Sequence, residues 1–144
     1  IQPEREDVTD RLPYIYSHDD LQSITANPAG TNSERFVVLS VQLGLEAYDT
    51  EESPPDDDIT GALKDNTTVL EKIALYDLKI KALITSIIRG KTVDELDAQF
   101  QNELESEMRD VLNREIFDRL FKIDDENKIK VRIVEVNISD IIIQ

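Results

Sequence analysis

The spacing of hydrophobic residues changes along the chain, and each spacing predicts a different element. Between residues 37 and 45 apolar and more polar side chains alternate, and the apolar set is Val37, Leu39, Val41, Leu43 and Leu45. Alternation over this length predicts a strand with one buried face in an antiparallel sheet. A short apolar stretch at 21–26 and the turn-rich segment NPAGTNSE predict that the two stretches pair as a hairpin.

Helical spacing follows the segment TEESPPDDDITG, whose prolines and acids predict a solvated loop. Steps of three and four residues predict a helix that begins between Ile59 and Thr68. Its expected apolar stripe is Val69, Ile73, Tyr76, Ile80, Leu83, Ile84 and Ile87. A second stripe runs from Leu96 to Leu120 and drifts by about 40° at each step of four residues. We therefore expect a bend or break near residues 100–103, or a diagonal path across the sheet.

The segment RGKTVDEL joins the two helical stripes. Gly90 predicts a left-handed stop for the first helix, and Arg89 and Lys91 are cations beside the negative end of its dipole. Thr92, followed three residues later by Glu95, predicts a capping box at the start of the second helix. The segment therefore predicts a tight corner between two helices.

The chain ends on the apolar run VEVNISDIIIQ, after the polar turn KIDDENK. Ile129, Val131 and Ile133 predict one face of a strand, but the apolar set changes parity at Ile133–Val134, and DIII follows Ile138. This change predicts either burial on both faces or a β-bulge. In order, the elements predict an α+β fold, ββααβ, with two helices packed on one face of a small antiparallel sheet.

The composition predicts a single domain with an acidic surface. The chain has 144 residues, which fits one domain, and a formal charge of −15. Such an acidic surface repels phosphate, so we expect no nucleic-acid partner. The absence of Cys excludes disulfides, zinc–thiolate sites and thiol nucleophiles. The chain begins at Ile1 rather than Met, so we expect a processed form or a fragment.

No segment predicts a catalytic, cofactor-binding or metal site. SHDD (17–20) holds the one histidine, but catalytic triads are assembled from separate segments, so we expect a solvated loop. The acid runs at 56–58 and 124–126 lack the ligand pattern of a calcium-binding loop. RGKT (89–92) lacks the first glycine of a phosphate-binding loop and follows a predicted helix. We therefore expect a non-enzymatic binding or structural module.

Three segments resemble the C-terminal domain of the FliL family, the flagellar basal body-associated proteins. After Gly90, the corner matches the family pattern S-K-T-x-E-E-L at Lys91, Thr92, Glu95 and Leu96. The end of the chain is similar to V-x-F-T-x-F-I-I-Q at Val136, Ile138, Ile141, Ile142, Ile143 and Gln144. The strand RFVVLSVQLGLEAYD resembles the family's Y-L-K-V-S-L-x-L-E-V, and the resemblance covers residues 21–144. The chain departs from the family at DAQFQNE, where T-P-E-G is usual.

The resemblance implies a non-enzymatic accessory of the flagellar motor. FliL-like proteins have one membrane helix and a periplasmic domain similar to the stomatin/prohibitin (SPFH) fold. That domain is thought to form a ring around the stator protein MotB, supporting the active MotA–MotB unit and aiding motility and torque. Here an inner-membrane helix would precede Ile1, residues 1–20 would be a membrane-proximal linker or flexible arm with YIY as a local anchor, and 21–144 would be the periplasmic domain.

Two expectations about partners follow. Because a charge of −15 per copy opposes self-association, interfaces between copies should be apolar or should pair the basic residues of 66–144 with a neighbour's acids. We expect the isolated domain to self-associate weakly. The alternative function is another extracytoplasmic, membrane-anchored SPFH-like scaffold with no flagellar role.

Overall fold

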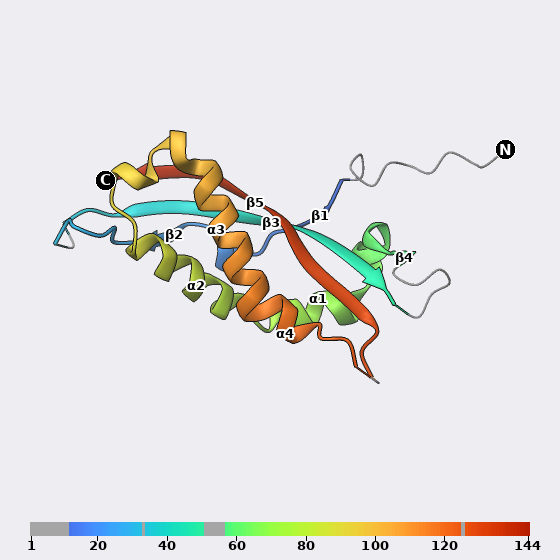
Figure 1. The fold of residues 1–144 in the computed structure, drawn as a ribbon. Coiled ribbons are helices and arrows are strands. Elements are labelled where there is room, and N and C mark those ends of the chain that lie inside the picture. The colour runs from blue at the N-terminus through green and yellow to red at the C-terminus, as the bar shows by residue number, and fades with distance from the viewer. Residues whose placement is uncertain (1–11, 33, 51–56, 125) are drawn as a thin grey trace.

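The computed structural model describes residues 12–32, 34–50, 57–124 and 126–144 (Figure 1). Residues 1–11 of the predicted arm and residues 51–56 of the predicted acidic loop lie outside the described residues. The described chain forms an antiparallel sheet with its helices on one face, which confirms the predicted α+β class.

The sheet is built around β3 (Val37–Asp49), to which every other described strand pairs antiparallel. One edge of β3 holds β5 (Ile129–Ile143) over its whole length. The opposite edge holds three short strands in turn, β2 (Ile24–Ala26), β1 (Tyr14–Tyr16) and β4 (Asp57–Asp58). Thus β2 and β3 form the predicted hairpin, and YIY forms β1, which pairs with β3.

The core face of β3 follows the predicted alternation. At most 1% of each of its core-facing side chains is exposed: Val37, Leu39, Val41, Leu43, Leu45 and Ala47. The apolar stripes of the helices pack on this face, so the core lies between the sheet and the helices.

Two β-bulges let β5 face the same core despite its irregular pattern. Gly44 pairs with Glu135 and Leu45 with Ile133, so Val134 is an extra residue. A second shift lies opposite Leu39, where Asp140 has a φ of 56°. The residues of β5 that contact the core therefore change parity twice: Val131 and Ile133, then Val136 and Ile138, then Ile141 and Ile143. The structure confirms the bulge alternative.

The first predicted helix is two helices, α1 (Thr67–Ala74) and α2 (Asp77–Arg89), separated at Leu75–Tyr76. Tyr76, predicted on the buried stripe, is 37% exposed, and the next residue, Asp77, is buried instead. Helical spacing allows either residue to lie between Ile73 and Ile80 on the core face.

The capping box at the corner forms, but it caps only the short 3-10 turn Asp94–Leu96. A second 3-10 turn, Ala98–Phe100, follows extended Asp97 and leads into α3 (Gln101–Leu112). This confirms the break expected near residue 100. α3 continues through the π-helical turn Asn113–Phe117 into α4 (Asp118–Leu120).

The predicted left-handed stop at Gly90 is wrong. Its φ is −84°, and its N–H donates to the carbonyl oxygens of Ser86 and Ile87. The chain leaves α2 in a right-handed turn that leads directly into the corner, so the glycine meets no left-handed requirement here.

Candidate functional site

The corner between α2 and α3 contains most of the first family-like motif. The backbone N–H and hydroxyl of Thr92 both donate to Glu95 Oε1 at 3.1 Å, and these bonds lower the pKa of the Glu95 carboxyl. The carbonyl oxygen of Lys91 accepts a hydrogen bond of 2.8 Å from the N–H of Ala29. The corner is thus fixed internally and tied to the turn between β2 and β3.

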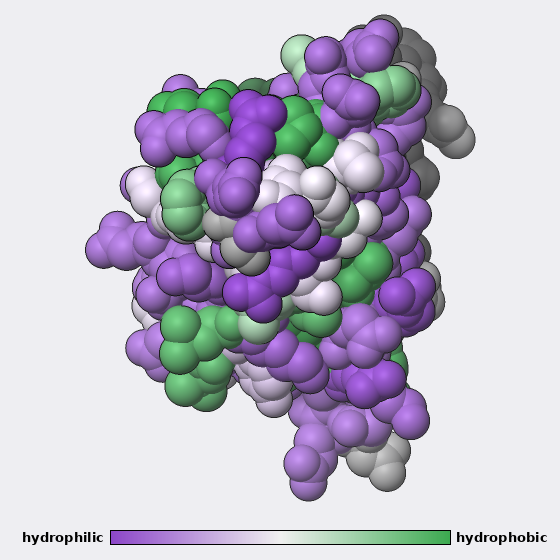
Figure 2. Space-filling model, turned by 90° about the vertical axis from the view of Figure 1, so that its left-hand side faces the viewer, coloured by the Kyte–Doolittle hydropathy of each residue, from purple (hydrophilic) through white to green (hydrophobic). Residues whose placement is uncertain are grey.

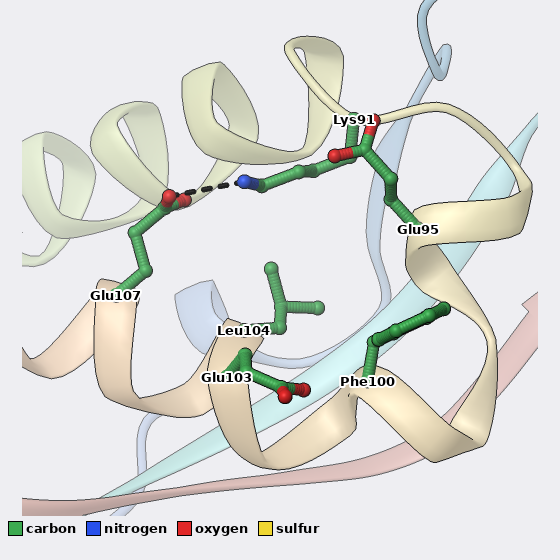
Figure 3. A pocket seen from close by; sticks show the side chains of 6 residues that line it. All are labelled: Lys91, Glu95, Phe100, Glu103, Leu104 and Glu107. Carbon is green, nitrogen blue, oxygen red and sulfur yellow. Dashed lines mark hydrogen bonds and ion pairs between the residues drawn. The ribbon is translucent and has the colours of Figure 1, made fainter.

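A pocket opens at this corner and is shown in Figure 3. Its lining is Lys91, Glu95, Phe100, Glu103, Leu104 and Glu107. Lys91 reaches from the end of α2 to α3, where its Nζ lies 3.0 Å from Glu107 Oε1. Three carboxylates and one ammonium give the pocket a net charge of −2. Its volume, about 290 Å³, is at the lower end for small-molecule sites, so it better suits a side chain of a protein partner.

A second hollow brings the two family-like motifs together. On the corner side it is lined by Leu96, Asp97, Ala98 and Gln101, and on the β5 side by Ile138, Asp140, Ile141 and Ile143. Val136 is buried further along β5. Gln144 exchanges two backbone hydrogen bonds with Phe36, of 3.0 and 2.8 Å. The family-like end of the chain therefore packs beside the corner, although Lys91 and Glu95 face the other pocket.

Polar side chains of the α3 segment close the outer edge of β5. Buried Asn113 donates from Nδ2 to the Ile133 carbonyl and accepts at Oδ1 from the Ile133 N–H, both at 2.8 Å. Gln101 donates to the Ile138 carbonyl at 3.2 Å, and Glu105 accepts from the Ile138 N–H at 2.8 Å. These contacts replace a neighbouring strand, which leaves less free edge for unwanted pairing.

At the other edge of β3, buried Asp77 ties the β1 segment to α2. The Tyr16 hydroxyl donates to Asp77 Oδ1 at 2.6 Å, and His18 Nδ1 lies 2.6 Å from Asp77 Oδ2. The rings of Tyr16 and His18 stack with a centroid separation of 5.8 Å. Within the described residues, Oδ2 has no hydrogen-bond partner of good geometry, so the short contact with Nδ1 needs a proton on one of the two atoms to be attractive.

The electrostatics of this group follow from burial. Burial raises the pKa of Asp77, against the hydrogen bond from Tyr16 and the charge of His18, which lower it. Burial and the neighbouring carboxylate raise the pKa of Tyr16 strongly. Together with Asp20, the group offers three possible metal-ligand atoms within 4.8 Å of one another. Two ligands of one ion would be about 3 Å apart, so the 2.6 Å contact fits an ion pair better than a metal site.

Ser17, His18 and Asp19 of SHDD are exposed, as predicted, but His18 also makes a contact that the sequence did not predict. His18 is 48% exposed and contacts an acid 59 positions further along the chain. The one signal for this contact is Asp77 itself, because an acid on a core-facing helical position needs a partner.

No helix among the described residues is both long enough and apolar enough to cross a lipid bilayer. No curated protein matches the chain. A family model described as flagellar basal body-associated protein FliL matches residues 20–144, a range that includes β2, β3, the corner and β5. The chain therefore belongs to the FliL family of flagellar basal body-associated proteins.

Proposed function

We propose that this chain is the periplasmic domain of a membrane-anchored, non-enzymatic accessory protein of the flagellar motor. Its copies assemble around the stator, MotA–MotB, and support its active form. The observation that carries this proposal is the FliL match across residues 20–144. The same match favours a flagellar role over a scaffold without one, and the similarity to SPFH domains stays a prediction.

A domain of this kind acts through preferential binding. If assembled copies bind the active conformation of the stator better than the inactive one, they shift the population toward the active form. Each tenfold shift requires about 1.4 kcal/mol of differential binding. The continuous pairing of β3 with β5 and the packing of α3 against β5 supply the rigid body that such binding needs.

The contacts of Asp77 with Tyr16 and His18, which we call the Asp77 clamp, support the proposed attachment to a membrane anchor. In a membrane-anchored protein, force reaches the domain through the segment that leads to the anchor. β1 pairs with β3, and Tyr16 and His18 both contact α2 through Asp77. The position at which the arm leaves the domain is therefore fixed by the sheet and by a helix together.

Site-specific crosslinking in flagellated cells tests the proposal. Photoreactive residues would replace exposed Ala82 and Ser86 on α2 and Asn102 on α3, with exposed Thr25 on the opposite face of the sheet as the matched control. We expect the helix positions to capture stator protein and further copies of the chain. Capture of neither from any position, together with normal swimming after deletion of the protein, would overturn the proposal.

A further inference from the structure

An exposed apolar surface lies where α1 meets α2. Leu75 is 83% exposed and Leu78 is 69% exposed, and Lys79 is exposed beside them. We call these three residues the leucine corner. Within the described part of the chain Lys79 forms no ion pair. Two neighbouring leucines left this open to water on a folded domain indicate a contact surface.

The charge around the leucine corner is opposite to that of the molecule as a whole. Residues 71–81, the segment around the leucine corner, contain three lysines and two acids, and one of these acids is the buried Asp77. Residues 92–110 contain seven acids and one arginine. The end of the helical layer where α1 meets α2 is therefore weakly basic, and the corner end is acidic although Lys91 lines its pocket.

The acidic half carries the corner pocket described above (Figure 3). Phe100, on its wall, is 41% exposed, and Leu104 forms an apolar floor. Glu103 is exposed and, among the residues the structure describes, has no cationic partner. The pocket thus offers an aromatic surface and a free carboxylate, which complement the two leucines and the free ammonium of the leucine corner.

The two surfaces lie at opposite ends of α2. This helix has 13 residues and is about 20 Å long. In Figure 1 it runs from α1 toward the corner at the left of the view, and that end of the molecule faces the reader in Figure 2, where separate apolar patches are set in a hydrophilic surface. A copy that docks its leucine corner in a neighbour's pocket keeps its own pocket free for a third copy.

We propose that the leucine corner of one copy docks into the corner pocket of the next, so that Leu75 and Leu78 cover Phe100 and Lys79 meets Glu103. The inference rests on the proposed function, in which copies assemble around the stator. The contact is heterologous, and it generates a ring if its rotation closes and a filament if it does not.

Charge argues against the symmetric alternatives. Two leucine corners placed together would bring lysines face to face, and two pockets would bring carboxylates face to face. The overall charge of −15 repels copies at long range, so the contact is weak in solution. A membrane anchor would strengthen it by raising the effective concentration of neighbouring copies.

Disulfide trapping tests the contact directly, because the chain has no cysteine of its own. Leu78→Cys and Phe100→Cys copies would be mixed under mild oxidation, in the anchored protein in cells and as the isolated chain at high concentration. The matched control replaces Leu78→Cys with Leu12→Cys, since Leu12 is 88% exposed and lies outside both surfaces. We expect about tenfold more heterodimer than in the control, which corresponds to about 1.4 kcal/mol of preference.

Leu78→Cys dimers without the heterodimer would indicate symmetric pairing and would overturn the proposal, as would equal trapping in the control. A second experiment avoids cysteine chemistry. Leu78→Asp copies and Phe100→Asp copies should each be monomeric alone but should form 1:1 dimers when mixed, because each copy keeps one intact surface. A mixture that stays monomeric while the wild type associates contradicts the proposed pairing.

These results also separate this inference from the proposed function. One outcome is that Leu78→Cys and Phe100→Cys copies form no heterodimer while other helix positions still capture copies and stator protein. In that case only the assigned surfaces are wrong. If no surface position captures another copy, the assembly itself is wrong, and this inference fails with it.

Discussion

β3 is bordered on one edge by a single strand of 15 residues and on the other by three strands of three, three and two residues. The long partner, β5, keeps its apolar residues on the core through two bulges. The short partners meet β3 one after another, with helices and loops between them. The comparison shows two ways to complete a sheet around one regular strand: a continuous strand that adjusts its register, or a divided edge with separate contacts.

The two sides are also secured by different chemistry. Beside β5, the neutral amide of Asn113 bonds both backbone groups of Ile133. Beside β1, the ionisable groups of Tyr16, His18 and Asp77 hold the arm on α2. An amide keeps its hydrogen bonds at every ordinary pH, whereas a buried carboxyl depends on its proton. The stability of the β5 side should therefore respond to packing and that of the β1 side to pH.

The largest expected effect is the loss of the end of β5. Deleting Asp140 to Gln144 removes the pairs Val37↔Ile143 and Val38↔Ile142 and both backbone hydrogen bonds to Phe36. It also exposes part of the core, so the free energy of unfolding should fall by about 3–5 kcal/mol in urea titrations. The control is Ile142→Ala, an outward-facing and half-exposed side chain of the same segment, which should cost under about 1 kcal/mol. A truncated chain that unfolds at the full-length midpoint would contradict the assignment of β5.

The next effect concerns the amide that closes the β5 edge. Asn113→Ala leaves the buried N–H and carbonyl of Ile133 without partners, so it should cost about 2–4 kcal/mol. Hydrogen exchange at the Ile133 amide should accelerate in parallel. Asn102→Ala, at an exposed position of α3, is the matched control and should cost less than about 0.5 kcal/mol. Equal costs for the two variants would show that β5 needs no support from Asn113.

A smaller effect distinguishes the bulge at Asp140 from the regular pleat of β3. Its φ of 56° suits glycine and is strained for a β-branched residue. Asp140→Val should therefore be less stable than Asp140→Gly by about 1–2 kcal/mol, as measured by thermal and urea unfolding. If the two variants are equally stable, the second register shift relies on some feature other than this backbone conformation.

The contrast between β3 and β5 explains how much of the fold could be predicted from sequence. β3 has no bulge, so every second residue along it faces the core. Its buried face was therefore predicted correctly from the alternation of apolar residues. In β5 the parity change indicated a bulge or two buried faces, and only the pairing with Gly44 and Leu45 decides between them. The capping box of Thr92 and Glu95 was predicted correctly because it depends on residues close in sequence. The length of the helix that follows depends on packing, and here the box caps only a short 3-10 turn.

The Asp77 clamp could not be predicted, because it depends on contacts between distant segments. Tyr16 and His18 lie 61 and 59 positions before Asp77, and no local period connects them. Helical spacing also allowed either Tyr76 or Asp77 to face the core, and the structure exposes Tyr76 and buries Asp77. The leucine corner lies beside them, at the break between α1 and α2.

The smallest expected effect is the pH dependence of stability that Asp77 causes beside β1. Burial raises the pKa of Asp77 above its ordinary 3.8, so the folded state keeps a proton that the unfolded state has already lost. Stability should therefore fall as pH rises from the unfolded pKa toward the folded one. Asp77→Asn has no such proton. The wild type should therefore lose stability relative to this variant as the pH rises above about 4, the ordinary pKa of an aspartate.

Urea titrations at several pH values would measure this difference, and Tyr16→Phe provides the directional control. Its hydroxyl lowers the pKa of Asp77, so the variant should raise that pKa further and extend the loss of stability to higher pH. The cost of Asn113→Ala should stay constant over the same range, because an amide does not titrate there. Parallel pH curves for wild type and Asp77→Asn would mean that Asp77 binds its proton equally in both states, and the proposed difference between the two sides of β3 would then be one of geometry alone.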